Sequence, residues 1–271
     1  MNETPTTQPS SSSVHAPTSE LAAGEHPEHE APPSPVTWRA VLLAALLTPL
    51  NCFWIIESDI VHYVGFSTTI SLFYNVVFSL LLVLAVNAVL RRWFPAWRLR
   101  QTEMMTVYVM LAISSALCGH DQIQILVSMV AHPVQYATTS NQWETLFLHK
   151  LPQWAIVTDK AALHDFYGGH TSLYTAQHLR AWMTPVLVWT AFITVMLFVM
   201  LCINVIVRKQ WTESEKLTFP IVFLPLEMTD ENGKLWRNRS MWMGFTLAGA
   251  IDLLNGFQKI FPSLPMVPNK T

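Results

Sequence analysis

The chain has 271 residues, of which 51% are hydrophobic and only 13% are charged. A soluble domain usually carries about 25% charged residues, so this composition excludes an ordinary cytosolic enzyme. The formal net charge of −2 excludes the basic surface that a nucleic-acid partner needs, and the three cysteines lie in apolar stretches rather than in a disulfide framework. We therefore expect an all-α, polytopic helical membrane protein in contact with the lipid bilayer.

Residues 1–35 differ in composition from the rest of the chain. They contain seven Pro, ten Ser or Thr, five Glu and no Lys or Arg. Such a segment buries too little apolar surface to offset the entropy cost of ordering, and it lacks the basic start and apolar core of a signal peptide. We expect a disordered cytoplasmic tail, followed by a transmembrane helical domain over residues 36–271.

Four segments are long and apolar enough to form helices across the hydrocarbon core, which needs about 20 residues. They cover residues 38–57, 67–90, 183–207 and 241–257. The last segment is the weakest candidate, because it contains Asp252 and Asn255.

A fifth apolar region is interrupted. The stretch from Met104 to Cys118 would extend over roughly 22 Å as a helix, which is short of the roughly 30 Å hydrocarbon core. Gly119, His120 and Asp121 then separate it from a second apolar stretch. Residues 120–136 therefore form either a re-entrant or interfacial helix or a second short crossing.

The basic residues favour the first alternative. The short loop 208–239 contains six Lys or Arg, and loops of this kind lie on the cytoplasmic side. That placement requires a cytoplasmic N-terminus and no crossing by residues 120–136. We therefore expect about five transmembrane helices plus a re-entrant or interfacial helix.

In this topology the long loop 119–182 is extracytoplasmic. It is too long to be structureless in a compact protein, and its Trp and Tyr residues favour the headgroup level, so we expect short helices along the membrane face. His164, His170 and His178 fit no zinc-ligand spacing and have no cysteine nearby. We therefore predict neither a metal nor a cofactor.

Catalytic motifs are missing from the sequence. HExxH, GxSxG, CxxC and GxxxxGK[ST] do not occur, so no catalytic residue is predicted.

Polar residues near the spans are candidates for a solute pathway. Asp59 and His62 are spaced i and i+3, which on an α-helix places them on one face. A carboxylate and an imidazole at a membrane mouth suit a proton relay or cation entry. His120 and Asp121 lie at the helix break, and broken helices at membrane depth normally line a cavity.

Asp252 and Asn255 complete the set of candidates. A carboxylate inside a span costs roughly 2.5–3.5 kcal/mol on insertion scales, so Asp252 should face protein or water. The alternative for all six residues is structural: charges that meet water at the interface, a helix cap at Asp121, and one carboxylate satisfied by neighbouring helices.

Two sequence pieces in the cytoplasmic loop resemble a known group of proteins. Residues 211–220, Trp-Thr-Glu-Ser-Glu-Lys-Leu-Thr-Phe-Pro, and residues 224–228, Leu-Pro-Leu-Glu-Met, resemble a signature of uncharacterised bacterial multi-pass membrane proteins. Those proteins are distantly similar to the oligopeptide-transporter superfamily. The resemblance implies a location in the bacterial inner membrane and a longer architecture, of which this chain would be the N-terminal part.

Together these features predict an integral membrane protein of transporter-like type that moves a small solute. The alternative is a non-catalytic membrane subunit or scaffold, with other membrane subunits or a second copy of the chain as partners. A third interpretation is a membrane-embedded enzyme that uses the histidines of loop 119–182.

Overall fold

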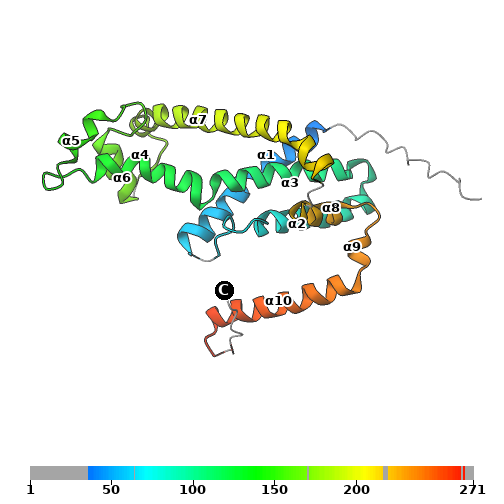
Figure 1. Ribbon diagram of the computed structural model, residues 1–271. Coiled ribbons are helices and arrows are strands. Elements are labelled where there is room, and N and C mark those ends of the chain that lie inside the picture. The colour runs from blue at the N-terminus through cyan, green and yellow to red at the C-terminus, as the bar shows by residue number, and fades with distance from the viewer. Residues whose placement is uncertain (1–35, 64, 170, 216–218, 264, 266–271) are drawn as a thin grey trace, which may run out of the picture. The chain divides into compact units, whose positions relative to one another are not determined.

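The computed structural model describes residues 36–63, 65–169, 171–215, 219–263 and 265 (Figure 1). Throughout this part of the chain the regular secondary structure is helical, with no strand. The predicted all-α fold is therefore confirmed for these residues. The predicted disordered tail, residues 1–35, lies outside them.

The helices follow one another with short connections. The α-helices are α1 (Trp38–Ile56), α2 (Tyr74–Trp93), α3 (Gln101–Cys118), α4 (Ile125–Gln135), α5 (Trp143–Leu146), α6 (Lys160–Gly168), α7 (Ala176–Lys209), α8 (Pro220–Thr229), α9 (Lys234–Arg237) and α10 (Arg239–Ile260). Wider π-helical turns form η1 (Glu57–Val61), η3 (His120–Gln124) and η5 (Gln210–Ser214), and 3₁₀ turns form η2 (Pro95–Trp97) and η4 (Leu148–Lys150).

Four helical segments of the described residues are long and apolar enough to cross a membrane. They are Trp38–Val61, Tyr74–Trp93, Gln101–Gln135 and Ala176–Ser214. The multi-pass helical character predicted from composition agrees with this result. The predicted fifth span, 241–257, forms most of α10, a helix of 22 residues that is not among these four.

The segment Gln101–Gln135 contains the interrupted apolar region. Its 35 residues would extend over about 52 Å as a straight helix, which exceeds the roughly 30 Å hydrocarbon core. The helix is broken at Gly119, where the backbone is extended with φ −67° and ψ 175°. The segment therefore cannot lie within one straight crossing.

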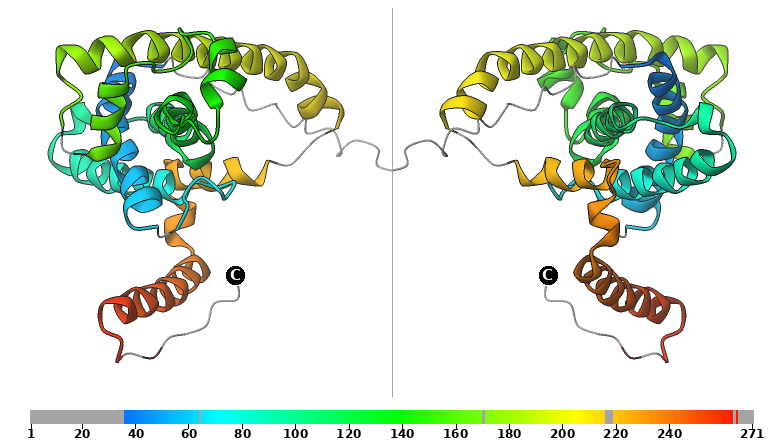
Figure 2. Two further views of the ribbon diagram at one scale, coloured as in Figure 1. Left: turned by 90° about the vertical axis from the view of Figure 1, so that its left-hand side faces the viewer. Right: turned by 90° about the vertical axis from the view of Figure 1, so that its right-hand side faces the viewer.

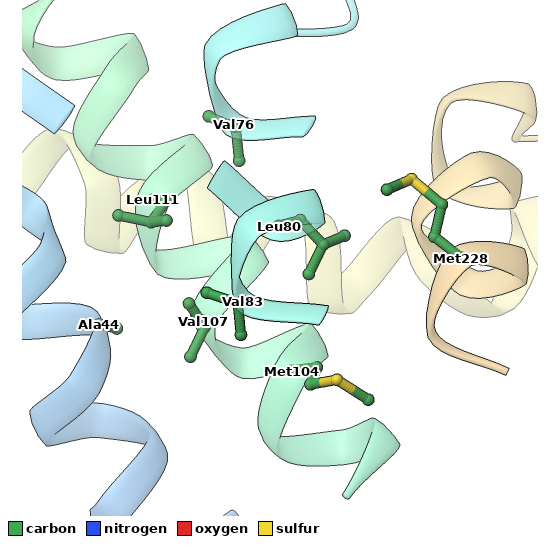
Figure 3. Packing of buried hydrophobic residues seen from close by; sticks show 8 residues of the cluster. All are labelled: Ala44, Val76, Leu80, Val83, Met104, Val107, Leu111 and Met228. Carbon is green, nitrogen blue, oxygen red and sulfur yellow. The ribbon is translucent and has the colours of Figure 1, made fainter. Parts of the chain in front are cut away.

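Helices α1, α2 and α3 pack together, and α8 packs against α2 and α3. Ala40 and Ala44 on α1 are fully buried, and such small residues let neighbouring membrane helices approach closely. The central cluster of this bundle, shown in Figure 3, comprises Ala44, Val76, Leu80, Val83, Met104, Val107, Leu111 and Met228.

A second apolar cluster joins α4, α6 and the start of α7. It contains Val130, Ala131, Val134, Val157 and Leu163. The Val157 N–H donates to the Val130 carbonyl at 3.2 Å, and the Trp189 indole N–H donates to the Ala155 carbonyl at 2.9 Å. Residues 155–163 thus pack against α4 and α7, and loop 119–182 contains the short helices α4, α5 and α6.

Helices α7 and α10 present most of their apolar side chains outward. In α7, the buried residues are His178 and Pro185, both near its start. The chain reaches α10 through α9 (Figure 2), and Met243, Leu247 and Leu253 of α10 are exposed. Apolar side chains that face outward suit contact with lipid or with partner helices.

Candidate functional site

A buried carboxylate lies where α1 ends. The helix continues into the π turn η1, which carries Asp59, and only 1% of this residue is exposed. Its Oδ1 accepts a hydrogen bond from the Ser58 hydroxyl at 3.1 Å, whereas its buried Oδ2 has no hydrogen-bond partner among the described residues. Single π turns occur frequently at functional sites, and a buried charge without full compensation is costly.

The helix break predicted after Cys118 is present at Gly119. The Gly119 N–H still donates to the Ser115 carbonyl at 2.9 Å, and the chain then turns into η3. A side chain at Gly119 would place its Cβ 2.5 Å from the Thr68 Cγ2 atom. The connection between η1 and α2 therefore packs directly onto the break, which leaves room only for glycine.

A pocket of about 620 Å³ opens between η1 on one side and η3 with α4 on the other. Its polar lining consists of Asp59, Tyr63, His120, Gln124, Ser128 and His132. Two residues predicted from different spans, Asp59 and His120, thus line the same pocket. We call it the Asp59–His120 pocket.

One wall of this pocket is a regular polar stripe. His120, Gln124, Ser128 and His132 are each four residues apart, so they lie on one face of η3 and α4. The Ser128 hydroxyl donates to the Gln124 carbonyl at 3.1 Å. The centroids of the His132 and Tyr136 rings lie 4.5 Å apart, and this contact restrains the orientation of the imidazole.

One family model accounts for most of the chain. The model of a family of unknown function, DUF6785, matches residues 30–271. The chain belongs to the DUF6785 family. Comparison with curated proteins found no match, and comparison with solved structures also found none. The description of DUF6785 names no activity, so the resemblance to oligopeptide transporters stays a prediction.

The other predicted site residues lie elsewhere in this DUF6785 chain. His62 forms a pair with Glu57, with 3.6 Å between His62 Nε2 and Glu57 Oε2, and 69% of the His62 side chain is exposed. Asp121 is exposed and does not line the pocket. On α10, Asp252 is exposed and Asn255 is half-buried, and neither lines the pocket.

The expected pairing of Asp59 with His62 is wrong. It assumed α-helical spacing, but the His62 N–H donates to the Glu57 carbonyl at 2.9 Å, five residues back. A π turn has more residues per turn than an α-helix, so positions i and i+3 no longer share a face. Asp59 consequently turns into the protein while His62 turns outward.

Sequence reasoning missed a buried polar cluster among the first three helices. The Asn51 side-chain amide donates to the Ser115 hydroxyl at 2.8 Å, and the Asn75 side-chain amide donates to the Asn51 side-chain Oδ1 at 2.8 Å. Asn75 also donates to Ser115 at 3.0 Å, which links α1, α2 and α3. The signal was the occurrence of Asn51 and Asn75 inside otherwise apolar spans.

The histidines of loop 119–182 do not assemble a metal centre in the described residues. No group of three or more His, Cys, Asp or Glu there is placed to hold a metal ion. His178 is buried and instead contacts Asp165, with 3.1 Å between Nε2 and Oδ2. His164 is exposed, and His170 lies outside the described residues.

Proposed function

We propose that this chain is part of an integral membrane protein that binds a small polar or cationic solute in the Asp59–His120 pocket and moves it across the membrane. The observation that carries the proposal is the buried Asp59 carboxylate, which lines a pocket of about 620 Å³. That volume lies within the range of roughly 300–1,000 Å³ that is typical of small-molecule sites.

The pocket chemistry favours a solute with hydrogen-bond donors or positive charge. The Asp59 carboxylate attracts cations, and the pocket also contains two imidazoles, His120 and His132, which accept or donate hydrogen bonds. Ionisable residues at membrane depth are otherwise expensive, so they mark a solute or ion path by default. A small ammonium compound or a zwitterion fits this arrangement.

The distribution of charge supports a pocket on the extracytoplasmic side. At the start of α1, Arg39 lies 3.4 Å from Glu103 and donates to the Arg98 carbonyl at 3.2 Å. Asp59 and His120 follow the opposite ends of α1 and α3. Because basic residues collect on the cytoplasmic side, we propose an N-terminus in the cytoplasm, a bacterial inner-membrane location and α10 as a fifth crossing.

The proposal is tested by ligand binding to the purified full chain. Small amines and amino acids are screened by thermal unfolding, and each stabilising compound is then tested for uptake into proteoliposomes. Asp59→Asn and His120→Ala should weaken its apparent affinity about tenfold or more, because a hydrogen bond to a charged group contributes about 1.5–3 kcal/mol. The matched control is His149→Ala, an exposed histidine outside the pocket. Equal loss in the control would contradict the proposal.

A second candidate function, a membrane subunit, is favoured by one observation on α10. Asp252 is exposed on a helix whose Leu247 and Leu253 are also exposed. A carboxylate facing lipid costs roughly 2.5–3.5 kcal/mol on insertion scales, so it requires a polar neighbour from another helix. Native electrophoresis after gentle solubilisation tests this function. Asp252→Leu should release a partner chain, whereas unchanged migration would count against a subunit role.

A further inference from the structure

Four side-chain oxygens near the Asp59–His120 pocket are buried without a hydrogen bond among the described residues. They are Asp59 Oδ2, Ser67 Oγ, Thr68 Oγ1 and Asn75 Oδ1. Asp59 and Ser67 are each 1% exposed, and Asn75 is fully buried. Native structures leave few such atoms, and each one calls for an explanation.

These oxygens come from adjoining parts of the fold. The Tyr74 phenol interacts with the Asp59 charge and with the Ser67 hydroxyl, so η1 and the connection to α2 adjoin each other at this tyrosine. Thr68 packs on Gly119, and Asn75 donates to Ser115 one turn before that glycine. The four residues therefore belong to the region where the ends of α1 and α3 meet the start of α2.

The chemistry of this zone matches a hard cation. Carboxylate, hydroxyl and amide carbonyl oxygens are the ligands that such ions prefer. Bound water would satisfy the oxygens but leave the Asp59 charge uncompensated in a low-dielectric interior. A proton on Asp59 would remove the charge but add only one donor, so it would leave most of the oxygens without a partner.

The charge count selects a monovalent ion. Among the four oxygens, the negative charge is that of Asp59 and the others are neutral. A divalent ion would leave a net positive charge in this buried site, whereas a monovalent ion makes the site neutral. We propose that Asp59, Ser67, Thr68 and Asn75 form a binding site for a sodium ion beside the solute pocket.

Because Asp59 also lines the pocket, the ion fixes the carboxylate that faces the solute. This role as a coupling ion rests on the proposed function, but ion binding itself does not. A bound sodium would also hold η1 and Thr68 against the break at Gly119, on which Thr68 packs.

The test is binding of ²²Na⁺ to the purified full chain in detergent, at constant ionic strength set with choline chloride. Saturable binding of one ion per chain is expected. Ser67→Ala removes one ligand oxygen and should weaken sodium binding on the order of tenfold, and Asp59→Asn should weaken it further. The matched controls are Ser79→Ala, whose hydroxyl already donates to the Asn75 carbonyl at 2.8 Å, and Asp121→Asn, an exposed carboxylate.

Absence of saturable binding to the unmodified chain would overturn the site, as would full binding by both Ser67→Ala and Asp59→Asn. If low pH stabilised the folded chain and sodium did not, a proton rather than a sodium ion would occupy the site, and the proposal would be overturned. If Asp59→Asn fails to fold, sodium binding by Ser67→Ala alone decides whether the site exists. Sodium binding without any solute binding would refute the proposed function and leave the ion site standing.

Discussion

At Gly119 the connection after η1 packs directly onto the helix break. An added Cβ would lie 2.5 Å from Thr68 Cγ2 and 2.7 Å from Thr68 Cβ. Gly119→Ala should therefore destabilise the chain by about 1–3 kcal/mol, the usual cost of overpacking. Thermal unfolding in detergent measures this loss. Gly244→Ala is the control, because its Cβ would meet no atom within 4 Å, and helical Ala is favoured over Gly by roughly 0.5–1 kcal/mol.

A second substitution, at Thr68, tests whether this contact causes the loss of stability. Because even the Thr68 Cβ lies too close, only Thr68→Gly removes the whole contact. The double variant Gly119→Ala with Thr68→Gly should lose less stability than the sum of the single variants. Strict additivity would show that the effect of Gly119→Ala arises elsewhere.

The sequence indicated which residues are chemically notable, but it could not indicate which of them lie close together in the fold. Asp59 and His120 stood out because ionisable side chains are rare near apolar spans. Their common pocket depends on how the fold places η1 opposite η3 and α4, which no local pattern encodes. The π turn of η1 was equally hidden, because it arises from local widening of the helix, and it turned His62 away from Asp59.

The polar cluster of Asn51, Asn75 and Ser115 ties three helices together at the element scale. Asn51→Leu removes the acceptor of Asn75 and the donor to Ser115. Hydrogen bonds between membrane helices contribute about 0.6 kcal/mol on average and up to about 1.7 kcal/mol, so a loss of roughly 1–3 kcal/mol is expected in reversible unfolding. The control is Asn204→Leu on α7, whose amide donates to its own helix at Met200. Equal losses would contradict a role in joining helices.

Long apolar runs made the membrane helices predictable, whereas the polar stripe on α4 was overlooked. Residues 120, 124, 128 and 132 were visible at a four-residue spacing. The break at Gly119 drew attention to the His120-Asp121 pair instead of the periodicity beyond it. Only the fold shows that this stripe faces Asp59 across a pocket.

The cap of α6 gives an element-scale dependence on pH. The Asp159 carboxylate accepts from the Ala162 N–H at 3.1 Å, the Gln177 amide at 3.3 Å and the Ala161 N–H at 2.9 Å. These hydrogen bonds hold the pKa of Asp159 below its ordinary value, and the bond from the Ala162 N–H has the largest effect. A lowered pKa stabilises the folded state above the unfolded pKa of about 3.9, and this contribution is lost as pH falls through the folded value.

Asp159→Asn should keep a capping oxygen and remove this dependence. Hydrogen exchange of the α6 amides between about pH 5 and pH 3, corrected for the intrinsic rate, should show added opening at low pH in the unmodified chain. The variant should show less of this added opening. Asp121→Asn, an exposed carboxylate in another helix, should behave like the unmodified chain.

On the scale of the whole molecule, the distribution of basic residues along the bundle bears on how the pocket is oriented in a membrane. Arg39 and Arg98 gather near the start of α1, and Arg91 and Arg92 end α2. The Asp59–His120 pocket lies beyond the opposite end of α1. If this basic end is cytoplasmic, as proposed, the pocket opens toward the extracytoplasmic side.

Accessibility of single cysteines to a membrane-impermeant maleimide tests this orientation. Asn232 precedes α10 and Ser263 follows it, and both are exposed. If α10 crosses the membrane and loop 208–239 is cytoplasmic, Asn232→Cys should be labelled only from the cytoplasm and Ser263→Cys only from outside. His149→Cys should behave like Ser263→Cys if α4 does not cross. Labelling of positions 232 and 263 from the same side would show that α10 does not cross the membrane. Labelling of position 149 only from the cytoplasm would make α4 a crossing and place the basic loop 208–239 outside.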